Sequence, residues 1–145
     1  MRKSCDFSQL FLNSMIIGIG NDIISINRVE KAIEREAFIK RVYTDNEINY
    51  CESRGKGKAA SYAARFAAKE AVLKAFGTGL RYGELTDIEI LNDDLGAPVI
   101  KLYGAFLELA KNKGVKTAHI SLSHEREFAT AFCVLEGQNE DSSER

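Results

Sequence analysis

The segment Gly18-Ile19-Gly20-Asn21-Asp22 has residue types that could bind phosphate groups or place a carboxylate beside a ligand. A dinucleotide-binding fingerprint needs a third glycine at the start of a helix. Ile23 occupies that position, and residues 23–26 do not open a helix, so a Rossmann site is not supported. Asp22 remains as a carboxylate just after an expected strand, where most aspartates cap a turn or a helix.

A second candidate lies in an expected long helix, in which Glu70 and Lys74 are one turn apart. The apolar stripe of this helix consists of Tyr62, Phe66, Leu73 and Phe76, and Lys69 falls inside it. An exposed Glu–Lys pair at this spacing contributes only ~0.2–0.5 kcal/mol. The residues that share the face of the pair are small: Ala63, Ala67 and Gly77. Small neighbours favour close approach by another chain or a ligand over a solvated face.

Three basic residues, Arg28, Lys31 and Arg35, follow one another at helical spacing. On one helix, spacings of three and four place all three side chains on a single face. Composition alone favours an ordinary solvated face. The alternative is a docking surface for an acidic helical partner.

The run Ser121-Leu122-Ser123-His124 places serines beside a histidine at the end of an expected strand. A serine hydrolase would need a nucleophile elbow, and no G-x-S-x-G sequence occurs anywhere in the chain. His124 could orient a ligand or serve a structural role. His119 is the only other histidine, so a metal-binding pair is not supported.

The composition describes an ordinary globular domain. The chain has 145 residues, of which 45% are hydrophobic and 28% are charged, and this length predicts one domain. Its apolar runs are too short to span a bilayer, so no membrane association is expected. The net charge of −1 gives no overall electrostatic case for nucleic acid, and a charged partner must meet a local patch.

The three cysteines, Cys5, Cys51 and Cys133, are odd in number and contain no C-x-x-C pair. This spacing argues against a disulfide framework and a zinc site, and it predicts reduced thiols in a cytoplasmic protein. The start Met1-Arg2-Lys3 could open a signal peptide, but the next ten residues include several polar ones, so secretion is not expected.

The order of the expected elements predicts an α+β fold with an antiparallel sheet, one long helix and a single domain, because the strands come in sequential pairs. Helices are expected over Asn27–Lys40, from a Thr44–Glu47 capping box to Arg54, and over Ala59–Phe76 and Gly104–Lys113. Strands are expected over Met15–Ile19, Asp87–Leu91, Pro98–Tyr103, His119–Ser123 and Phe128–Leu135. The domain is expected to span residues 15–136. Residues 1–14 form a variable arm or result from a misassigned start before Met15, and 137–145 form a polar tail.

Three of these segments together resemble the holo-acyl-carrier-protein synthases of the 4′-phosphopantetheinyl transferase superfamily. They are Gly18–Ile23, Arg65–Gly79 and Ser121–His124, and the string from Lys69 to Gly79 is the most specific part. Thr44–Glu47 and Asp94–Pro98 are also similar to this family. The resemblance runs from Met15 to about Glu136 and leaves residues 1–14 outside.

The resemblance implies a reaction in which a serine hydroxyl of apo acyl carrier protein attacks the β-phosphate of coenzyme A. The 4′-phosphopantetheine arm moves to the serine and adenosine 3′,5′-bisphosphate leaves, a step that serves fatty acid biosynthesis. It also implies small α+β subunits that form homotrimers with active sites at the subunit interfaces. The small-residue face around Ala63 and Ala67 is expected to lie near such an interface.

The resemblance also implies roles for particular residues. Asp22 and Glu70 would bind Mg²⁺, and Lys74 would contact the phosphates and offset charge on the leaving group, which makes these three the expected catalytic residues. Further contacts with coenzyme A are expected from Lys69, Gly77, Thr78, Gly79 and His124. The general base stays open between Glu70 and a metal-bound water.

Arg28 occupies the position where the family places a docking arginine for the acidic carrier protein, and Lys31 and Arg35 extend that face by spacing. The competing interpretation is a trimeric binding module of this fold that lacks catalysis, but Asp22, Glu70 and Lys74 are all present. Transferases for polyketide and peptide synthetases are a second alternative, and these are usually about twice this length.

Overall fold

The computed structural model describes residues 14–139, and the expectations for the arm and for the end of the tail lie outside this range. The helices of the described part are α1 (Ile26–Ala32), α2 (Glu36–Val42), α3 (Asp45–Glu52), α4 (Lys58–Phe76) and α5 (Gly104–Asn112). The strands are β1 (Ser14–Ser25), β2 (Ile88–Asn92), β3 (Pro98–Leu102), β4 (Val115–His124) and β5 (Phe128–Gln138). Short 3₁₀ turns cover Gly55–Gly57 and Leu85–Asp87.

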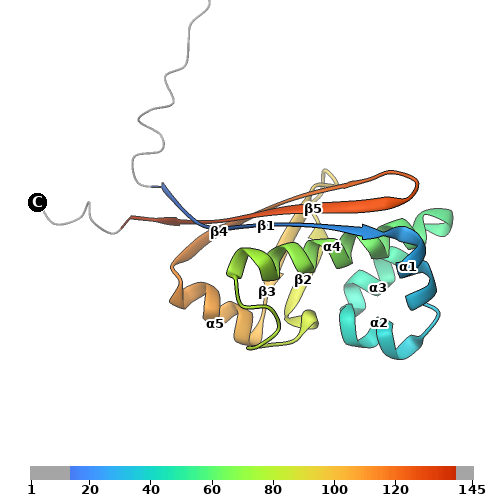
Figure 1. Cartoon of the computed structure of the whole chain (residues 1–145), viewed down its shortest axis with the longest axis horizontal. Coiled ribbons are helices and arrows are strands. Elements are labelled where there is room, and N and C mark those ends of the chain that lie inside the picture. The colour runs from blue at the N-terminus through green and yellow to red at the C-terminus, as the bar shows by residue number, and fades with distance from the viewer. Residues whose placement is uncertain (1–13, 140–145) are drawn as a thin grey trace, which may run out of the picture.

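The strands form two antiparallel sheets, which confirms the predicted α+β class. The larger sheet has the order β1-β5-β4, and β2 pairs with β3 in a separate hairpin. The helices lie on one side of the larger sheet, with α4 running beneath it (Figure 1). The core surrounds α4, which packs against β1 and β5 and also contacts α3 and β2, whose buried residues include Cys51, Ile88 and Ile90.

Helix α4 is rich in alanine, the residue with the highest helix propensity. It ends at Gly77, whose φ of 75° is the left-handed conformation that closes many helices, and the Gly77 N–H bonds back to Leu73 and Lys74 carbonyls. The alanines allow the helix to approach the sheet closely. This contact is tight, because a Cβ atom on Gly20 would lie 1.9 Å from the Ala71 carbonyl oxygen.

This packing accounts for the small-residue face of α4. Ala63 and Ala67 are completely buried within the single chain, and the helix packs against β1 and β5. These residues are small because the sheet of their own subunit covers them. Their small size is therefore explained within one chain, and a subunit boundary near this face stays a prediction.

Several element boundaries differ from the predicted ones. Strand β1 continues to Ser25, so Asp22 lies inside a strand instead of after one. Strand β4 already begins at Val115, and β5 continues to Gln138, so the residues expected to open the tail pair with the start of β1. Pairing of β1 and β4 with β5 lengthens all three strands beyond what their apolar patterns indicate.

The expected helix over Asn27–Lys40 is broken into α1 and α2. Arg35 has an extended conformation, with φ −96° and ψ 113°, and occupies the N-cap of α2. Glu30 and Glu34 would repel one another at i, i+4 spacing in a continuous helix. The break turns α2 so that Phe38 stacks on Phe66 of α4, with ring centroids 6.1 Å apart.

The face of the larger sheet that points away from α4 carries exposed apolar side chains. Ile19 is 60% exposed, Ile23 63% and Phe132 48%, and these residues come from the adjacent strands β1 and β5. No helix lies over this face in the described part of the chain (Figure 1). Contiguous apolar surface of this kind commonly marks an interaction site.

The two cysteines that the structure describes, Cys51 and Cys133, are buried and free. Burial raises the pKa of Cys51 to about 12 and that of Cys133 to about 11. Both thiols therefore stay protonated at neutral pH and have little thiolate reactivity. No helix of the described residues is long and apolar enough to cross a membrane.

Candidate active site

Asp22 and Lys74 meet where β1 crosses α4. Side chains alternate along a strand, so Asp22 shares the helix-facing side of β1 with Gly18 and Gly20. Lys74 Nζ lies 2.9 Å from Asp22 Oδ1 and donates a second hydrogen bond of 2.8 Å to the carbonyl of Asn21. The Asp22 side chain is 16% exposed and the Lys74 side chain 53%, so the pair opens to solvent on its lysine side.

Glu70 lies one turn before Lys74 on α4 and is half-buried. Burial raises the pKa of Glu70 above its usual range, the negative charge of Asp22 raises it further, and Lys74 acts in the opposite direction. The two carboxylates therefore lie within electrostatic reach of one another. The structure thus brings together Asp22, Glu70 and Lys74, the three residues that sequence reasoning singled out as catalytic.

A pocket of about 540 Å³ adjoins these charges at the C-terminal end of α4. It is lined by Glu70, Leu73, Lys74, Gly77, Gly79 and Leu80. Thr78 is half-buried between the two glycines, and its hydroxyl donates to the Gly79 carbonyl at 3.3 Å. The segment expected to contact a coenzyme therefore forms one wall of a pocket that also contains a carboxylate and a lysine.

A second concave surface lies on the other side of the carboxylates. It is a groove of about 520 Å³ lined by Ile24, Arg28, Val29, Lys31, Ala32, Arg35, Phe38 and Phe66. The three basic residues do not share one helix face, because the chain breaks before Arg35, yet all three line the same groove. We refer to this surface as the basic groove.

Lys69 does not reach the pocket, and the expectation that it contacts coenzyme phosphates is wrong. Its ammonium is completely buried, donates to the carbonyls of Leu85 at 2.9 Å and Ile88 at 2.7 Å, and lies 2.7 Å from Glu47 Oε1. An ammonium group has three donors, so this set uses all of them. Lys69 follows the apolar side of α4 into the core, whereas Glu70 faces the site.

His124 is exposed at the end of β4 and is not among the residues that line the pocket beside Lys74 in the described chain. The network around Lys69 was not predicted. The Thr44–Glu47 capping box is confirmed, but its glutamate also serves as the buried partner of Lys69. The one available indication was a lysine inside an apolar stripe, because such a charge needs a buried partner.

The donor set suits a hard divalent cation. Within residues 14–139 no group of three or more His, Cys, Asp or Glu side chains could hold a metal ion, so protein ligands would be the two carboxylates. Magnesium commonly takes one or two carboxylates and completes its shell with phosphate oxygens and water. The pKa of Glu70 is raised despite Lys74, so burial and the negative charge of Asp22 disfavour the ionised form of Glu70. A cation bound between the two carboxylates would relieve this.

Comparison with known proteins gives consistent results. A family model described as the 4′-phosphopantetheinyl transferase superfamily matches residues 18–133. The chain is 48% identical over 122 residues to a holo-[acyl-carrier-protein] synthase of Fusobacterium nucleatum, covering 83% of this chain and 99% of that protein. It is 50% identical over 126 residues to the enzyme of the same description from Clostridium tetani, covering 86% and 98%. A crystal structure of a holo-(acyl-carrier-protein) synthase from Bacillus anthracis in complex with CoA (3′,5′-ADP) matches with a TM-score of 0.70 and 41% identity, covering 85% of this chain and 98% of that one.

Proposed function

Because the chain belongs to the 4′-phosphopantetheinyl transferase superfamily, we propose that it transfers 4′-phosphopantetheine from coenzyme A to a serine of apo acyl carrier protein. The serine oxygen forms a bond to the β-phosphorus of coenzyme A as the bond to adenosine 3′,5′-bisphosphate breaks. The serine loses its proton to Glu70 or to water. The holo carrier protein that results serves fatty acid biosynthesis.

The main support for this proposal is the order of residues along helix α4. A residue of the basic groove comes first, the Glu70 carboxylate next and the pocket last. Phe66 lines the groove, Glu70 comes one turn later, Lys74 one turn after that, and Gly77 begins the far wall of the pocket. On the strand, Ile24 lines the groove two residues from Asp22. A macromolecule in the groove and a small ligand in the pocket would therefore meet at the carboxylates.

Each charged group has a distinct part in this reaction. Lys74 lines the pocket and keeps half of its side chain exposed, so its ammonium can leave Asp22 for a phosphate oxygen and offset charge on the departing group. Asp22 and Glu70 would hold Mg²⁺ as the cofactor. The cation, when bound, supplies charge neutralisation of the pyrophosphate.

The basic groove suits the acidic carrier protein. Arg28, Lys31 and Arg35 line the groove together with half-buried apolar side chains, Ile24, Phe38 and Phe66. Positive charges at a rim steer an acidic partner and fix its register, while apolar contacts at the centre supply affinity. The groove would thus deliver the acceptor serine to the carboxylates from the side opposite the coenzyme.

The exposed apolar face of the larger sheet supports assembly into a homotrimer. Ile19, Ile23 and Phe132 would be covered by neighbouring subunits. His124, which is exposed and lies outside the pocket of its own subunit, would then be available to a coenzyme bound at a neighbouring site. Buried reduced thiols and the use of coenzyme A agree with a cytoplasmic location.

The direct test is mass spectrometry of apo acyl carrier protein after incubation with the enzyme, coenzyme A and Mg²⁺. We expect a mass gain of one phosphopantetheine group, its loss when a chelator is added, and its return with excess Mg²⁺. Asp22→Ala and Glu70→Ala should each lower the rate at least about a hundredfold. Each removes a ligand of the proposed Mg²⁺ ion, whose charge stabilises the transition state. Asp94→Ala, in an exposed turn, is the matched control. Near-wild-type turnover of either variant at limiting Mg²⁺ would contradict the two-carboxylate site.

A further inference from the structure

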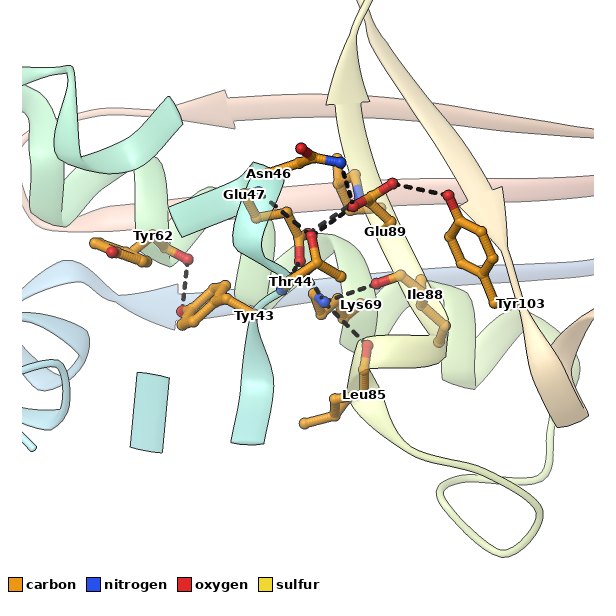
Figure 2. Close-up of polar contacts among 11 residues, drawn as sticks. Tyr43, Thr44, Asn46, Glu47, Tyr62, Lys69, Leu85, Ile88, Glu89 and Tyr103 are labelled. Atoms are coloured by element: carbon orange, nitrogen blue, oxygen red, sulfur yellow. Dashed lines mark hydrogen bonds and ion pairs between the residues drawn. The ribbon is translucent and has the colours of Figure 1, made fainter. Parts of the chain in front are cut away.

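A buried polar network lies beneath the candidate site, and Lys69 is at its centre. Figure 2 shows the Lys69 side chain pointing toward the carbonyl groups of Leu85 and Ile88. Glu47, the third partner, comes from α3. One ammonium group therefore connects α4 with α3, with the 3₁₀ turn and with the start of β2.

The carboxylate of Glu47 is equally well satisfied. Its Oε1 accepts the N–H of Thr44 at 2.8 Å, and its Oε2 accepts the N–H of Ile90 at 3.0 Å. The network continues through the Thr44 hydroxyl, which donates to Glu89 at 2.6 Å, and Glu89 also accepts from the Tyr103 hydroxyl at 3.1 Å (Figure 2). Both charges of the Glu47–Lys69 pair therefore have a full set of partners.

The attraction between the two charges alone does not explain why a lysine occupies position 69. Replacing a buried ion pair by apolar side chains of similar volume is often neutral or stabilising. An apolar residue at this position could fill the space between α4 and β2, but it could not hold two carbonyl oxygens. The distinctive property of Lys69 is thus that it donates hydrogen bonds to the backbone carbonyls of Leu85 and Ile88.

The loop 77–84 begins at the pocket and ends beside these two carbonyls. Gly77, Gly79 and Leu80 line the pocket at the first end of this loop, and the turn Leu85–Asp87 closes the second end. Leu80 is 48% exposed and Tyr82 59%, whereas Gly83, next to the second end, packs closely against Phe106 and the Asp87 carboxylate. The course of the loop is therefore set by its ends, and both ends are attached to α4, about 12 Å apart along the helix axis at ~1.5 Å per residue.

We propose that Lys69 is a positioning residue that fixes the loop 77–84, and with it the coenzyme wall of the pocket, by holding the carbonyls of Leu85 and Ile88. It touches no substrate and acts through the backbone. This inference rests on the proposed assignment of the pocket to coenzyme A.

The test compares the wild-type protein with Glu47→Gln and with the double variant Glu47→Gln/Lys69→Met. Coenzyme A binding is measured by calorimetry and stability by thermal unfolding. Glu47→Gln leaves Lys69 and its two carbonyl contacts in place but removes the counter-charge of a buried ammonium. The double variant removes both charges and keeps an unbranched side chain of similar volume at position 69.

We expect the two variants to rank in opposite order for stability and for coenzyme binding. Glu47→Gln should have the lower Tm yet bind coenzyme A within about twofold of the wild type, because the loop anchor is intact. The double variant should be at least as stable as Glu47→Gln, but its Kd for coenzyme A should rise by about tenfold, since misplaced binding groups lose affinity steeply. A purely structural role would make the loss of binding follow the loss of stability.

Coenzyme affinity in the double variant equal to that of Glu47→Gln would overturn the positioning role, as would affinities that follow Tm across the series. Absence of coenzyme binding by the wild-type protein would instead overturn the assignment of the pocket. If the double variant does not fold, Glu47→Gln/Lys69→Gln serves in its place. That variant keeps a hydrogen-bonding amide pair, and its side chain at position 69 is one bond too short to hold both carbonyls.

Discussion

Lys74 Nζ lies 2.9 Å from Asp22 Oδ1, and this contact joins the helix and the strand that carry the candidate catalytic groups. The two residues are 52 positions apart in the sequence. The pairing depends on the close approach of α4 to β1 at Gly18 and Gly20. The geometry of the candidate site is therefore sensitive to any change that pushes this helix away from the strand.

Gly20→Ala should destabilise the protein and disturb the site. The added Cβ would lie 1.9 Å from the Ala71 carbonyl oxygen, so the helix would have to move away from the strand. Overpacking of this kind typically costs about 1–3 kcal/mol. Denaturant unfolding measures the loss, and Gly57→Ala is the control, because a Cβ there would be 3.9 Å from its nearest neighbour. Equal stability of the two variants would show that the contact is not tight.

Glu70→Gln should stabilise the metal-free protein at neutral pH. The pKa of Glu70 is raised in the folded state, so the native protein holds this proton more tightly than the unfolded chain does. That favourable contribution is present at pH values below the carboxyl's ordinary pKa and is lost as the pH rises through the raised pKa. The variant should therefore have a higher Tm than the wild type at pH 7 without Mg²⁺, and the difference should vanish on acidification. Thermal unfolding from pH 3 to 8 measures it, with Glu108→Gln, an exposed carboxylate, as control. A lower Tm for Glu70→Gln at pH 7 would contradict the stated electrostatics.

Arg28→Glu should raise the KM for acyl carrier protein and leave the KM for coenzyme A little changed. The reversed charge repels the acidic partner at the rim of the basic groove, and such charges act over a Debye length of ~8 Å at physiological salt. The salt dependence should be weaker than that of the wild type, and the effect at Lys31 and Arg35 should be smaller. Steady-state kinetics with each substrate varied at low and high salt measure this, and Lys116→Glu, on β4, is the control. An unchanged carrier-protein KM at low salt would mean that the groove is only a solvated surface.

Phe132→Lys should break the proposed trimer without unfolding the subunit. Its side chain is 48% exposed on the uncovered face of the sheet, so a lysine is tolerated in the monomer but would be buried between subunits. Sedimentation velocity should show a shift from trimer to monomer together with loss of transfer activity. Leu95→Lys, at a hairpin tip where the side chain is 96% exposed, should stay trimeric. A fully active monomeric wild type would rule out sites shared between subunits.

Features that depend on local signals could be predicted from the residues alone. The alanine-rich helix and its glycine end, the Thr44–Glu47 capping box and the hairpin of β2 and β3 are all confirmed. These features are set within a few residues by propensity, capping and turn chemistry. The α+β class was predicted from the sequential pairing of strands.

What each side chain faces depends on contacts between segments that are distant in the sequence. Local spacing could not show that the helix after Ser25 breaks before Arg35, because Phe38 must reach Phe66 on another element. Nor could it show that Lys69 turns into the core while Glu70 and Lys74 meet Asp22. Periodicity fixes only which residues share a face of one element, whereas the partner across that face is chosen by packing between distant segments, where buried charges must be paired and small residues admit the closest approach.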